Sequence, residues 1–298
     1  MASLYKLQAK KGANRTAEEV EEGGFKPVKQ KVLILSSRGI TARHRFLIND
    51  LTALIPHSKK DTKLDTKQKL FQLNEVAELY NCNNIMFFEA RKHQDLYVWL
   101  SKPPNGPSFK LHIQNLHTMD ELNLTGNCLK GSRPILSFDS TFQTKPHFRV
   151  LQELLQQQFG VPKGARRSKP FVDHILTLTI ADNKIWFRNY QIAETQAKDG
   201  VLEDGTKRKA AKGETEIELI EVGPRFCMTL ICVLEGSFGG PLIYENKEYV
   251  SPNVVRREQR QEKAEAYKSR RAQTEDLKQK KVLSQREKGE LDNAVLFK

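Results

Sequence analysis

Glycine, histidine and cysteine residues are the first candidates for a chemical site in this sequence, because they build phosphate loops and metal centres. Residues 126–132 resemble a phosphate-binding loop, but Lys130 precedes the second glycine, whereas such a loop needs its lysine after that glycine. His112 and His117 are five residues apart, yet no carboxylate or cysteine completes a metal-binding set. Neither motif predicts a phosphate or metal site.

The four cysteines do not suggest catalysis or a disulfide scaffold. Cys227 and Cys232 have the wrong spacing for a zinc knuckle, and four cysteines are too few to staple a chain of 298 residues. They are typical of reduced thiols in the cytosol or nucleus. No Ser/His/Asp or paired-carboxylate set can be assembled from the sequence. We therefore predict a protein that is not an enzyme, with no catalytic residue, metal, cofactor or small-molecule substrate.

The balance of charge is more informative. The chain has 49 Lys and Arg against 36 Asp and Glu, which gives a formal net charge of +13, and 38% of its residues are hydrophobic. It can therefore bury a sizeable core. No apolar run approaches the roughly 18 residues needed to cross a bilayer, and residues 1–11 lack the apolar core of a signal peptide. We expect an intracellular protein, without a membrane segment, that attracts polyanions.

The basic residues gather at corresponding places of two segments. One group follows the first predicted strand and brackets the first predicted helix, another flanks a link near residue 126, and a third follows the helix of the second segment. Together they would form one surface that binds phosphates by releasing counterions, although solvated loops are the alternative. The predicted RNA-contacting residues are Arg38, Arg43, Arg45, Lys59, Lys60, Lys63, Lys130, Arg133, Lys163, Arg166, Arg167 and Lys169.

Four aromatic residues on predicted strands are candidates for stacking on unpaired bases. They are Tyr97, Trp99, Trp186 and Tyr190. Because aromatic residues on strands more often belong to the core, we expect core positions for all four.

Hydrophobic periodicity places these residues on two segments with the same order of elements. In residues 31–124 it predicts a strand at 31–36, helices at 43–55 and from Asp65 to about residue 80, and strands at 84–89, 95–100 and 108–114. The last two strands alternate, which indicates a sheet with one buried face. In residues 125–252 it predicts a strand at 134–138, a helix at 148–159, and strands at 172–180, 184–190, 216–222 and 225–234.

The repeated order predicts an α/β protein of two similar halves, each a mixed sheet with packed helices. Residues 197–213, rich in turn formers and charges, are expected to form an exposed loop. Residues 1–30 show no period and are expected to be a mobile extension. Residues 253–298 predict a long charged helix that lies on RNA or on a partner's helix, with a free disordered tail as the alternative.

Longer runs of the sequence resemble the Brix-domain family. The similarity covers roughly residues 31–253, and within the family it is strongest to the member that serves the large ribosomal subunit. Runs of this length are more specific than any short motif. The runs are 36–39, 43–45, 56–59, 63–65, 78–84, 88–97, 100–107, 115–122, 126–134, 235–240 and 249–253.

The resemblance implies a non-enzymatic assembly factor of the nucleus and nucleolus that binds the ribosomal RNA precursor during large-subunit (pre-60S) assembly and rRNA processing. Its implied partners are that RNA, other nucleolar assembly factors and ribosomal proteins. It also implies that each half is similar to the anticodon-binding domain of class IIa aminoacyl-tRNA synthetases. The alternative function is a protein-interaction scaffold, in which the sheets and residues 238–249 recruit other assembly factors and RNA contact is incidental.

Overall fold

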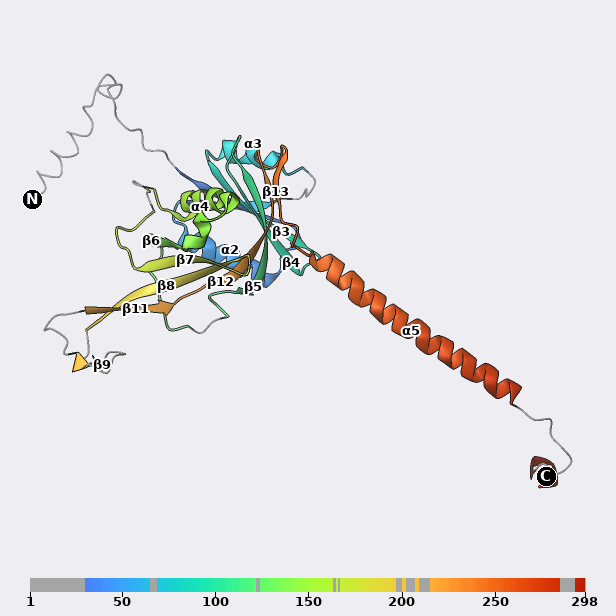
Figure 1. Cartoon of the computed structure of the whole chain (residues 1–298). Helices are drawn as coiled ribbons and strands as arrows, with labels where there is room; N and C mark the ends of the chain where they lie inside the picture. The colour runs from blue at the N-terminus through green and yellow to red at the C-terminus, as the bar shows by residue number, and fades with distance from the viewer. Residues whose placement is uncertain are drawn as a thin grey trace, which may run out of the picture. The chain divides into compact units, whose positions relative to one another are not determined.

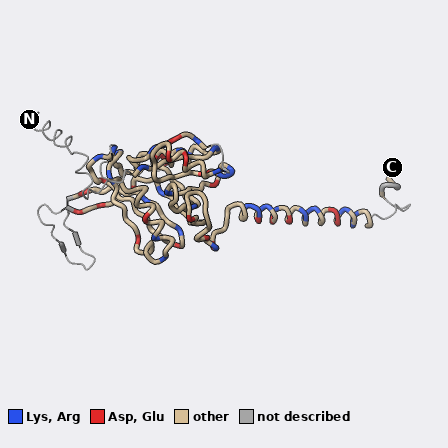
Figure 2. Tube along the Cα trace, turned by 90° about the horizontal axis from the view of Figure 1, so that it is seen from above, with Lys and Arg blue, Asp and Glu red and all other residues tan. Residues whose placement is uncertain are grey.

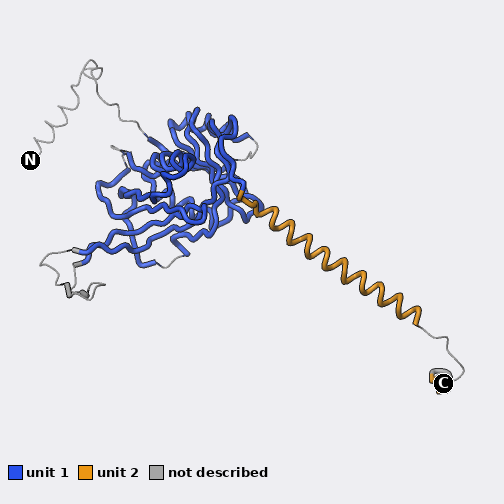
Figure 3. The backbone as a smooth tube through the Cα atoms, viewed as in Figure 1, with its two compact units in different colours: residues 1–247 blue, residues 248–298 orange. Residues whose placement is uncertain are grey.

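The protein is described here from a computed structural model that covers residues 30–64, 69–121, 124–162, 165, 167–196, 200–201, 207–208, 215–284 and 293–297. The chain divides into two compact units, residues 1–247 and residues 248–298 (Figure 3). Except for residue 30, the predicted N-terminal extension lies outside the described residues, as does most of the predicted loop at 197–213.

The first unit is built mainly of strands (Figure 1). Its elements in chain order are β1 (Val32–Ser37), α2 (Ala42–Leu54), β2 (Ser58–Leu64), α3 (Gln72–Leu79), β3 (Asn84–Arg91), β4 (Asp95–Ser101), β5 (Ser108–His117), β6 (Pro134–Phe138), the 3-10 helix η2 (Ser140–Gln143), α4 (Pro146–Phe159), β7 (His174–Ala181), β8 (Lys184–Gln196), β9 (Gly200–Val201), β10 (Lys207–Arg208), β11 (Thr215–Glu221), β12 (Arg225–Leu234) and β13 (Leu242–Glu245).

Strands of both predicted segments join in one sheet of 11 strands, in the order β2-β1-β3-β4-β5-β12-β8-β7-β6, with β11 beside β8 and β13 beside β12. β1 runs parallel to β2 and β3, β6 runs parallel to β7, and the other pairs are antiparallel. β5 and β12 pair from Ser108 opposite Leu234 to His117 opposite Arg225. The predicted mixed α/β class is confirmed, and the division into halves at residue 124 stays a prediction.

Two amphipathic helices, α2 and α4, pack on one face of the sheet, which we call the inner face. In α2, Leu47 and Leu51 recur at helical spacing and join the same buried cluster as Leu151 and Leu155 of α4. The Thr41 hydroxyl caps α2 by accepting a hydrogen bond from the His44 N–H at 3.4 Å. The core of the first unit therefore lies between these helices and the inner face.

The opposite, outer face of the sheet is covered at β1, β3 and β4 by helix α3. Leu73 and Ala77 of α3 share a second buried cluster with Phe87 and Trp99. All seven residues of β4 are consequently buried. The expectation of a single buried face is therefore wrong for β4, because a helix from elsewhere in the chain covers its second side.

Strand β2 was missed by the sequence analysis, which left Lys59, Lys60 and Lys63 in a loop. It is an edge strand parallel to β1, and its exposed charges hide its alternation. The periodicity likewise does not predict η2 or β13, or the two-residue strands β9 and β10 inside the expected loop at 197–213. Helix α3 starts at Gln72, later than predicted, and the proposed cap Asp65 lies outside the described residues.

The second unit contains α5 (Pro252–Leu283) and α6 (Asn293–Leu296), so the predicted C-terminal helix is confirmed. Proline at its first turn suits the start of α5, and no side chain of residues 252–283 is buried. Figure 2 shows Lys and Arg distributed along α5, with Asp and Glu between them. No helix in the described ranges is both long enough and apolar enough to span a bilayer.

Candidate nucleic-acid interface

Strand directions bring two groups of predicted RNA-contacting residues to one edge of the sheet. β1 and β2 end where β5 ends, because β3, β4 and β5 alternate in direction. From β5 through β12, β8 and β7 the direction alternates again, so β6 and β7 begin at that same edge. We call it the loop edge. The first group lies near β2 and β1, and the second lies near β7 and β6, at the other end of the strand order.

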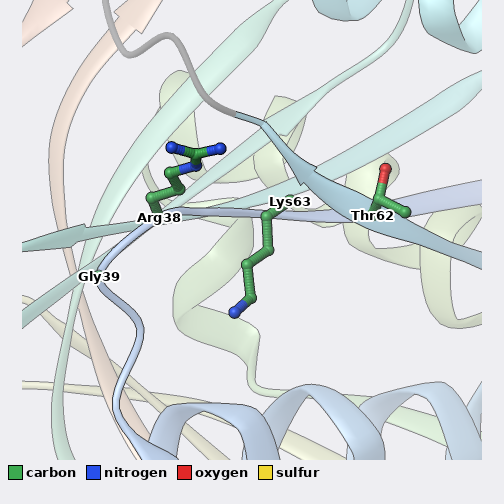
Figure 4. A pocket seen from close by; sticks show the side chains of 4 residues that line it. All are labelled: Arg38, Gly39, Thr62 and Lys63. Atoms are coloured by element: carbon green, nitrogen blue, oxygen red, sulfur yellow. The ribbon is translucent and has the colours of Figure 1, made fainter.

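Within the first group, Arg38 and Lys63 line a shallow, open hollow together with Gly39 and Thr62. Gly39 has a φ of +86°, and its carbonyl oxygen lies 2.9 Å from Nδ1 of His93, which fixes the turn after β1. Figure 4 shows the side chain of Arg38, at this turn, and that of Lys63, on the adjacent β2, extending in different directions. The hollow is thus a spread of positive charge and not a two-pronged clamp on one anion.

Arg43 and Arg45 lie in the first turn of α2, beside the end of β1. Both are exposed. Arg43 is engaged by Glu121, which follows β5: its Nε lies 2.7 Å from Oε1, and its NH2 group donates to Oε2 at 3.0 Å. This pair shows independently that the ends of β1 and β5 meet at the loop edge, and it neutralises part of the charge of Arg43.

The second group consists of Lys130, Arg133, Arg167 and Lys169, which belong to two stretches that run side by side. The Lys169 N–H donates to the Gly131 carbonyl at 2.6 Å, and the Arg133 N–H donates to the Phe171 carbonyl at 2.9 Å. Lys130, Arg167 and Lys169 are exposed, and Arg133 is half-buried. The backbone therefore gathers four cations into one turn-and-loop structure ahead of β6 and β7.

A polar cluster of buried Ser132 and His174 with half-buried Asp173 fastens this structure to β7. Nδ1 of His174 lies 3.1 Å from the Ser132 hydroxyl and 2.6 Å from the Asp173 carboxylate, which also accepts from the Leu129 N–H at 2.6 Å. Burial alone would raise the pKa of Asp173, but hydrogen bonds from Ser132, His174 and Leu129 hold it below its ordinary value.

These three residue types also make catalytic triads, but their arrangement here is different. Both Ser132 and Asp173 contact the same ring nitrogen of His174, whereas a proton relay needs them on opposite nitrogens. His174 is only 1% exposed. The cluster is therefore structural, and the described residues hold no group of three His, Cys, Asp or Glu that could bind a metal ion.

Four of the predicted residues are not brought to the loop edge by the described structure. Lys59 and Lys60 lie opposite Leu33 and Ile34, near the start of β1. The Lys60 ammonium donates to Oδ1 of Asn49 in α2 at 2.6 Å, whereas the Lys59 ammonium lies 3.5 Å above the Tyr80 ring, after α3. These two lysines therefore face opposite sides of the sheet. Lys163 and Arg166 lie outside the described residues.

Acidic side chains also lie at the loop edge, so its charge is mixed. Besides Glu121 and Asp173, Asp50 accepts a hydrogen bond from the Met119 N–H at 3.0 Å. Burial raises the pKa of Asp50, and the nearby charge of Asp120 adds to that effect, while the Met119 hydrogen bond opposes it. These carboxylates have backbone or arginine partners. The exposed side chains of Arg38, Arg45, Lys130, Arg167 and Lys169 supply positive charge at the same edge.

The four candidate aromatic residues separate into two kinds. Tyr97 and Trp99 are 3% and 7% exposed and belong to the core, as expected. The expected core position is wrong for Trp186 and Tyr190, which are half-buried on the outer face of β8 with Arg188 between them. The sequence analysis overlooked Arg188, although its period-2 spacing between two aromatic residues is a readable signal.

Comparison with known proteins gives concordant results. The family model described as Brix domain matches residues 37–232. Ribosome biogenesis protein BRX1 of Saccharomyces cerevisiae is 55% identical over 300 residues, which cover all of both chains. The Schizosaccharomyces pombe protein is 56% identical over 283 residues, or 91% of each chain, and the human homologue is 52% identical over 254 residues, or 81% of this chain and 66% of the human one.

Among solved structures, a probable ribosomal biogenesis protein from Aeropyrum pernix K1 aligns with 73% of this chain and 99% of its own. The TM-score is 0.42 and the sequence identity is 14%.

Proposed function

This chain belongs to the Brix-domain family, and on that premise we propose that it is a ribosome biogenesis factor that binds precursor ribosomal RNA during assembly of the large subunit. It acts in the nucleus and nucleolus and catalyses no reaction. It holds an immature RNA segment in one arrangement while neighbouring assembly factors and ribosomal proteins dock.

The observation that carries this proposal is the placement of two cation groups at the loop edge. Neighbouring strands are about 4.8 Å apart, so the nine strands from β2 to β6 span at most about 40 Å along that edge. An RNA that follows the edge meets Arg38 and Arg45 at one end and the Lys130, Arg167 and Lys169 group at the other. An RNA too short to reach both groups binds more weakly.

Counterion release provides the driving force. If about six cations of the loop edge bind phosphates of single-stranded RNA, the logarithm of the affinity falls by roughly four for each tenfold rise in salt. A nearly flat dependence on salt contradicts the proposal.

Charge reversal at one end of the loop edge tests it directly. The double variant Arg167→Glu/Lys169→Glu is expected to lose RNA crosslinks in purified precursor particles and to reduce the salt dependence, while pull-down of partner proteins stays intact. The matched control is Lys59→Glu/Lys60→Glu, which makes the same change of charge near the opposite ends of the strands. Equal losses in the two variants would mean that net charge matters and the loop edge does not.

A protein-interaction scaffold is the second candidate function, and exposed apolar residues on β13 favour it. Leu242 and Ile243 are 50% and 63% exposed. An Ile243→Asp variant that loses partner proteins but keeps its RNA crosslinks, together with an unaffected Arg167→Glu/Lys169→Glu variant, would establish this function in place of RNA binding.

Helix α5 adds a long charged surface without a core of its own. We propose that it lies along RNA or a partner's helix. Truncation before Pro252 is expected to lower recovery of the protein in precursor particles, and unchanged recovery would favour a free tail.

The strand order is also the basis for a proposal about architecture. In the first segment β1 is parallel to β3, and the next strands in the sheet, β4 and β5, each pair antiparallel. In the second segment β6 is parallel to β7, and the next strands, β8 and β12, again pair antiparallel. We propose that residues 31–124 and 125–252 are related halves, each similar to the anticodon-binding domain of class IIa aminoacyl-tRNA synthetases. Co-expressed halves that reassociate into a folded protein would support this division, and halves that fail to reassociate would count against it.

A further inference from the structure

The outer face of β6, β7 and β8 lies outside the part of the sheet that α3 covers. α2 and α4 cover the inner face, and α3 covers the outer face only at β1, β3 and β4. Within the described part of residues 31–247, no helix packs over the outer face of β6, β7 and β8. Along β7, inward-facing Leu176 and Leu178 are fully buried, whereas outward-facing Thr177 is half-buried and Thr179 is exposed.

Three side chains of β8 that can stack on bases project from this face. Alternate residues of a strand share one face, so Trp186, Arg188 and Tyr190 stand in one row, with the Cα atoms of Trp186 and Tyr190 about 13 Å apart. The guanidinium of Arg188 lies 5.8 Å from the centre of the Trp186 ring, and its NH1 group donates to the Tyr190 hydroxyl at 3.4 Å. Arg188 is thus held between the two aromatic rings.

The β7 neighbours of Trp186 and Arg188 are small, whereas Ile175 of β7 and Glu221 of β11 lie opposite Tyr190. Thr179 lies opposite Trp186, and Thr177 lies opposite Arg188 on β7, with Ser137 of β6 beyond it. On the other side Cys227 of β12 lies opposite Trp186. Trp186 and Tyr190 keep part of their surface exposed, and Thr177 and Thr179 offer hydroxyl groups to base edges or ribose.

The charge of this face suits a nucleic acid. Lys184, two residues before Trp186 on the same side of β8, is exposed. The nearest acidic neighbour, Glu221, lies opposite Tyr190 and is engaged by Arg225 at 3.5 Å. Cations beside partly exposed aromatic rings bind phosphates while the rings stack on bases.

We propose that Trp186, Arg188 and Tyr190 form a stacking platform for unpaired bases of single-stranded RNA. One base stacks on each ring, and Arg188 with Lys184 binds the connecting phosphates. This inference rests on the proposed function and adds a second, base-contacting surface to the phosphate-contacting loop edge. Stacking is tolerant of sequence, so the platform selects unpaired RNA over duplex RNA.

Tryptophan fluorescence of the full-length protein tests the proposal without a disruptive variant. The chain has two tryptophans, and Trp99 is 7% exposed in the core, so quenching by RNA reports on Trp186. A mixed-sequence single-stranded RNA is expected to quench the fluorescence, and a duplex of equal length is expected to bind without quenching. Trp186→Phe should abolish the quenching but retain most of the affinity, because phenylalanine still stacks. No quenching by the single strand overturns the platform.

Affinity measurements separate the platform from the loop edge. Trp186→Leu/Tyr190→Leu, which keeps the apolar bulk, is expected to weaken binding of the single strand at least tenfold with an unchanged salt dependence, because stacking releases no counterions. Trp186→Phe/Tyr190→Phe is the control for folding. If Arg167→Glu/Lys169→Glu weakens RNA binding but the leucine variant does not, the platform fails and the proposed function stands. If neither variant changes RNA binding, both fail, and loss of a protein partner from the leucine variant would assign the face to that partner.

Discussion

The hydroxyl groups of Ser101 and Ser237 lie 2.7 Å apart, although 136 residues separate them in the chain. Ser101 ends β4 and also contacts the Ser108 hydroxyl at 2.9 Å, while Ser237 donates to Oδ1 of Asn74 in α3 at 2.5 Å. The Asn74 amide returns a hydrogen bond to the Ser237 carbonyl at 3.0 Å. This buried network ties the loop after β12 to the β4–β5 hairpin and to α3, so residues far apart in the sequence fold as one unit.

Removing the Ser237 hydroxyl is expected to destabilise the protein. Ser237→Ala leaves Asn74 and Ser101 short of a partner inside the core, which costs about 1–3 kcal/mol of the free energy of unfolding. Urea denaturation measures the change. Ser140→Ala, which removes an exposed hydroxyl, should cost less than about 0.5 kcal/mol. Equal stability of the two variants would mean that the network contributes nothing.

Gly131 controls the geometry of the second cation group. Its φ is +86°, and a Cβ there would lie 2.8 Å from the Arg167 carbonyl oxygen. Gly131→Ala is therefore expected to destabilise the protein by about 1–3 kcal/mol and to weaken RNA binding, because the turn must move away from Arg167 and Lys169. Thermal unfolding and fluorescence anisotropy with a single-stranded RNA measure the two effects.

Gly239→Ala is the matched control, because a Cβ at that position meets no atom within 4 Å. Its stability and RNA affinity should stay close to those of the unmodified protein. If the two glycine variants bind RNA equally well, the shape of the turn at Gly131 is irrelevant to binding.

Much of the first unit could be predicted because its strands and helices carry strong periodicity. The alternation in β12 predicted residues 225–234, which the structure gives without change, and the stripe in α2 predicted 43–55 against Ala42–Leu54. β2 escaped prediction because an edge strand with one neighbour can expose most of its side chains, as Lys59, Lys60 and Lys63 do. Burial of β4 on both faces depends on α3, and no local pattern in β4 reports that contact.

Placement of the candidate site was less predictable than its composition. The sequence indicated which loops hold the cations. The edge of the sheet at which the loops of the two segments meet depends on strand directions, and these are fixed by the pairing of β5 with β12, more than 100 residues apart in the chain. The register of β2 with β1 separates Lys59 and Lys60 from the loop edge. Trp186 and Tyr190 could not be distinguished from Tyr97 and Trp99 by sequence, because only tertiary packing decides which strand face a helix covers.

His57 is expected to make stability depend on pH. Burial lowers its pKa from 6.5 to about 4, although the backbone of Gln158 opposes this effect. The folded state therefore holds His57 neutral, whereas the unfolded state binds a proton below pH 6.5. Its stabilising contribution is complete above pH 6.5 and is lost as the pH falls from 6.5 to about 4.

Between pH 7 and pH 5 this loss amounts to roughly 1–2 kcal/mol. His57→Gln removes the titrating group, so its free energy of unfolding should fall less over that interval than that of the unmodified protein. Urea denaturation at a series of pH values gives both curves. Parallel curves would show that His57 titrates alike in the folded and unfolded states.

Glu121 is expected to restrain RNA binding through its pair with Arg43. Both side chains are partly exposed, at 36% and 49%, so solvent screens the pair and Glu121→Gln should change stability by less than about 1 kcal/mol. The variant releases Arg43 to a phosphate, so RNA affinity should rise severalfold at low salt, and the slope against the logarithm of salt should steepen by up to about 0.7. Glu275→Gln removes the same charge from a similar pair with Arg271 in α5. If the two variants gained equally, the gain would come from net charge, and Arg43 would have no particular place on the RNA path.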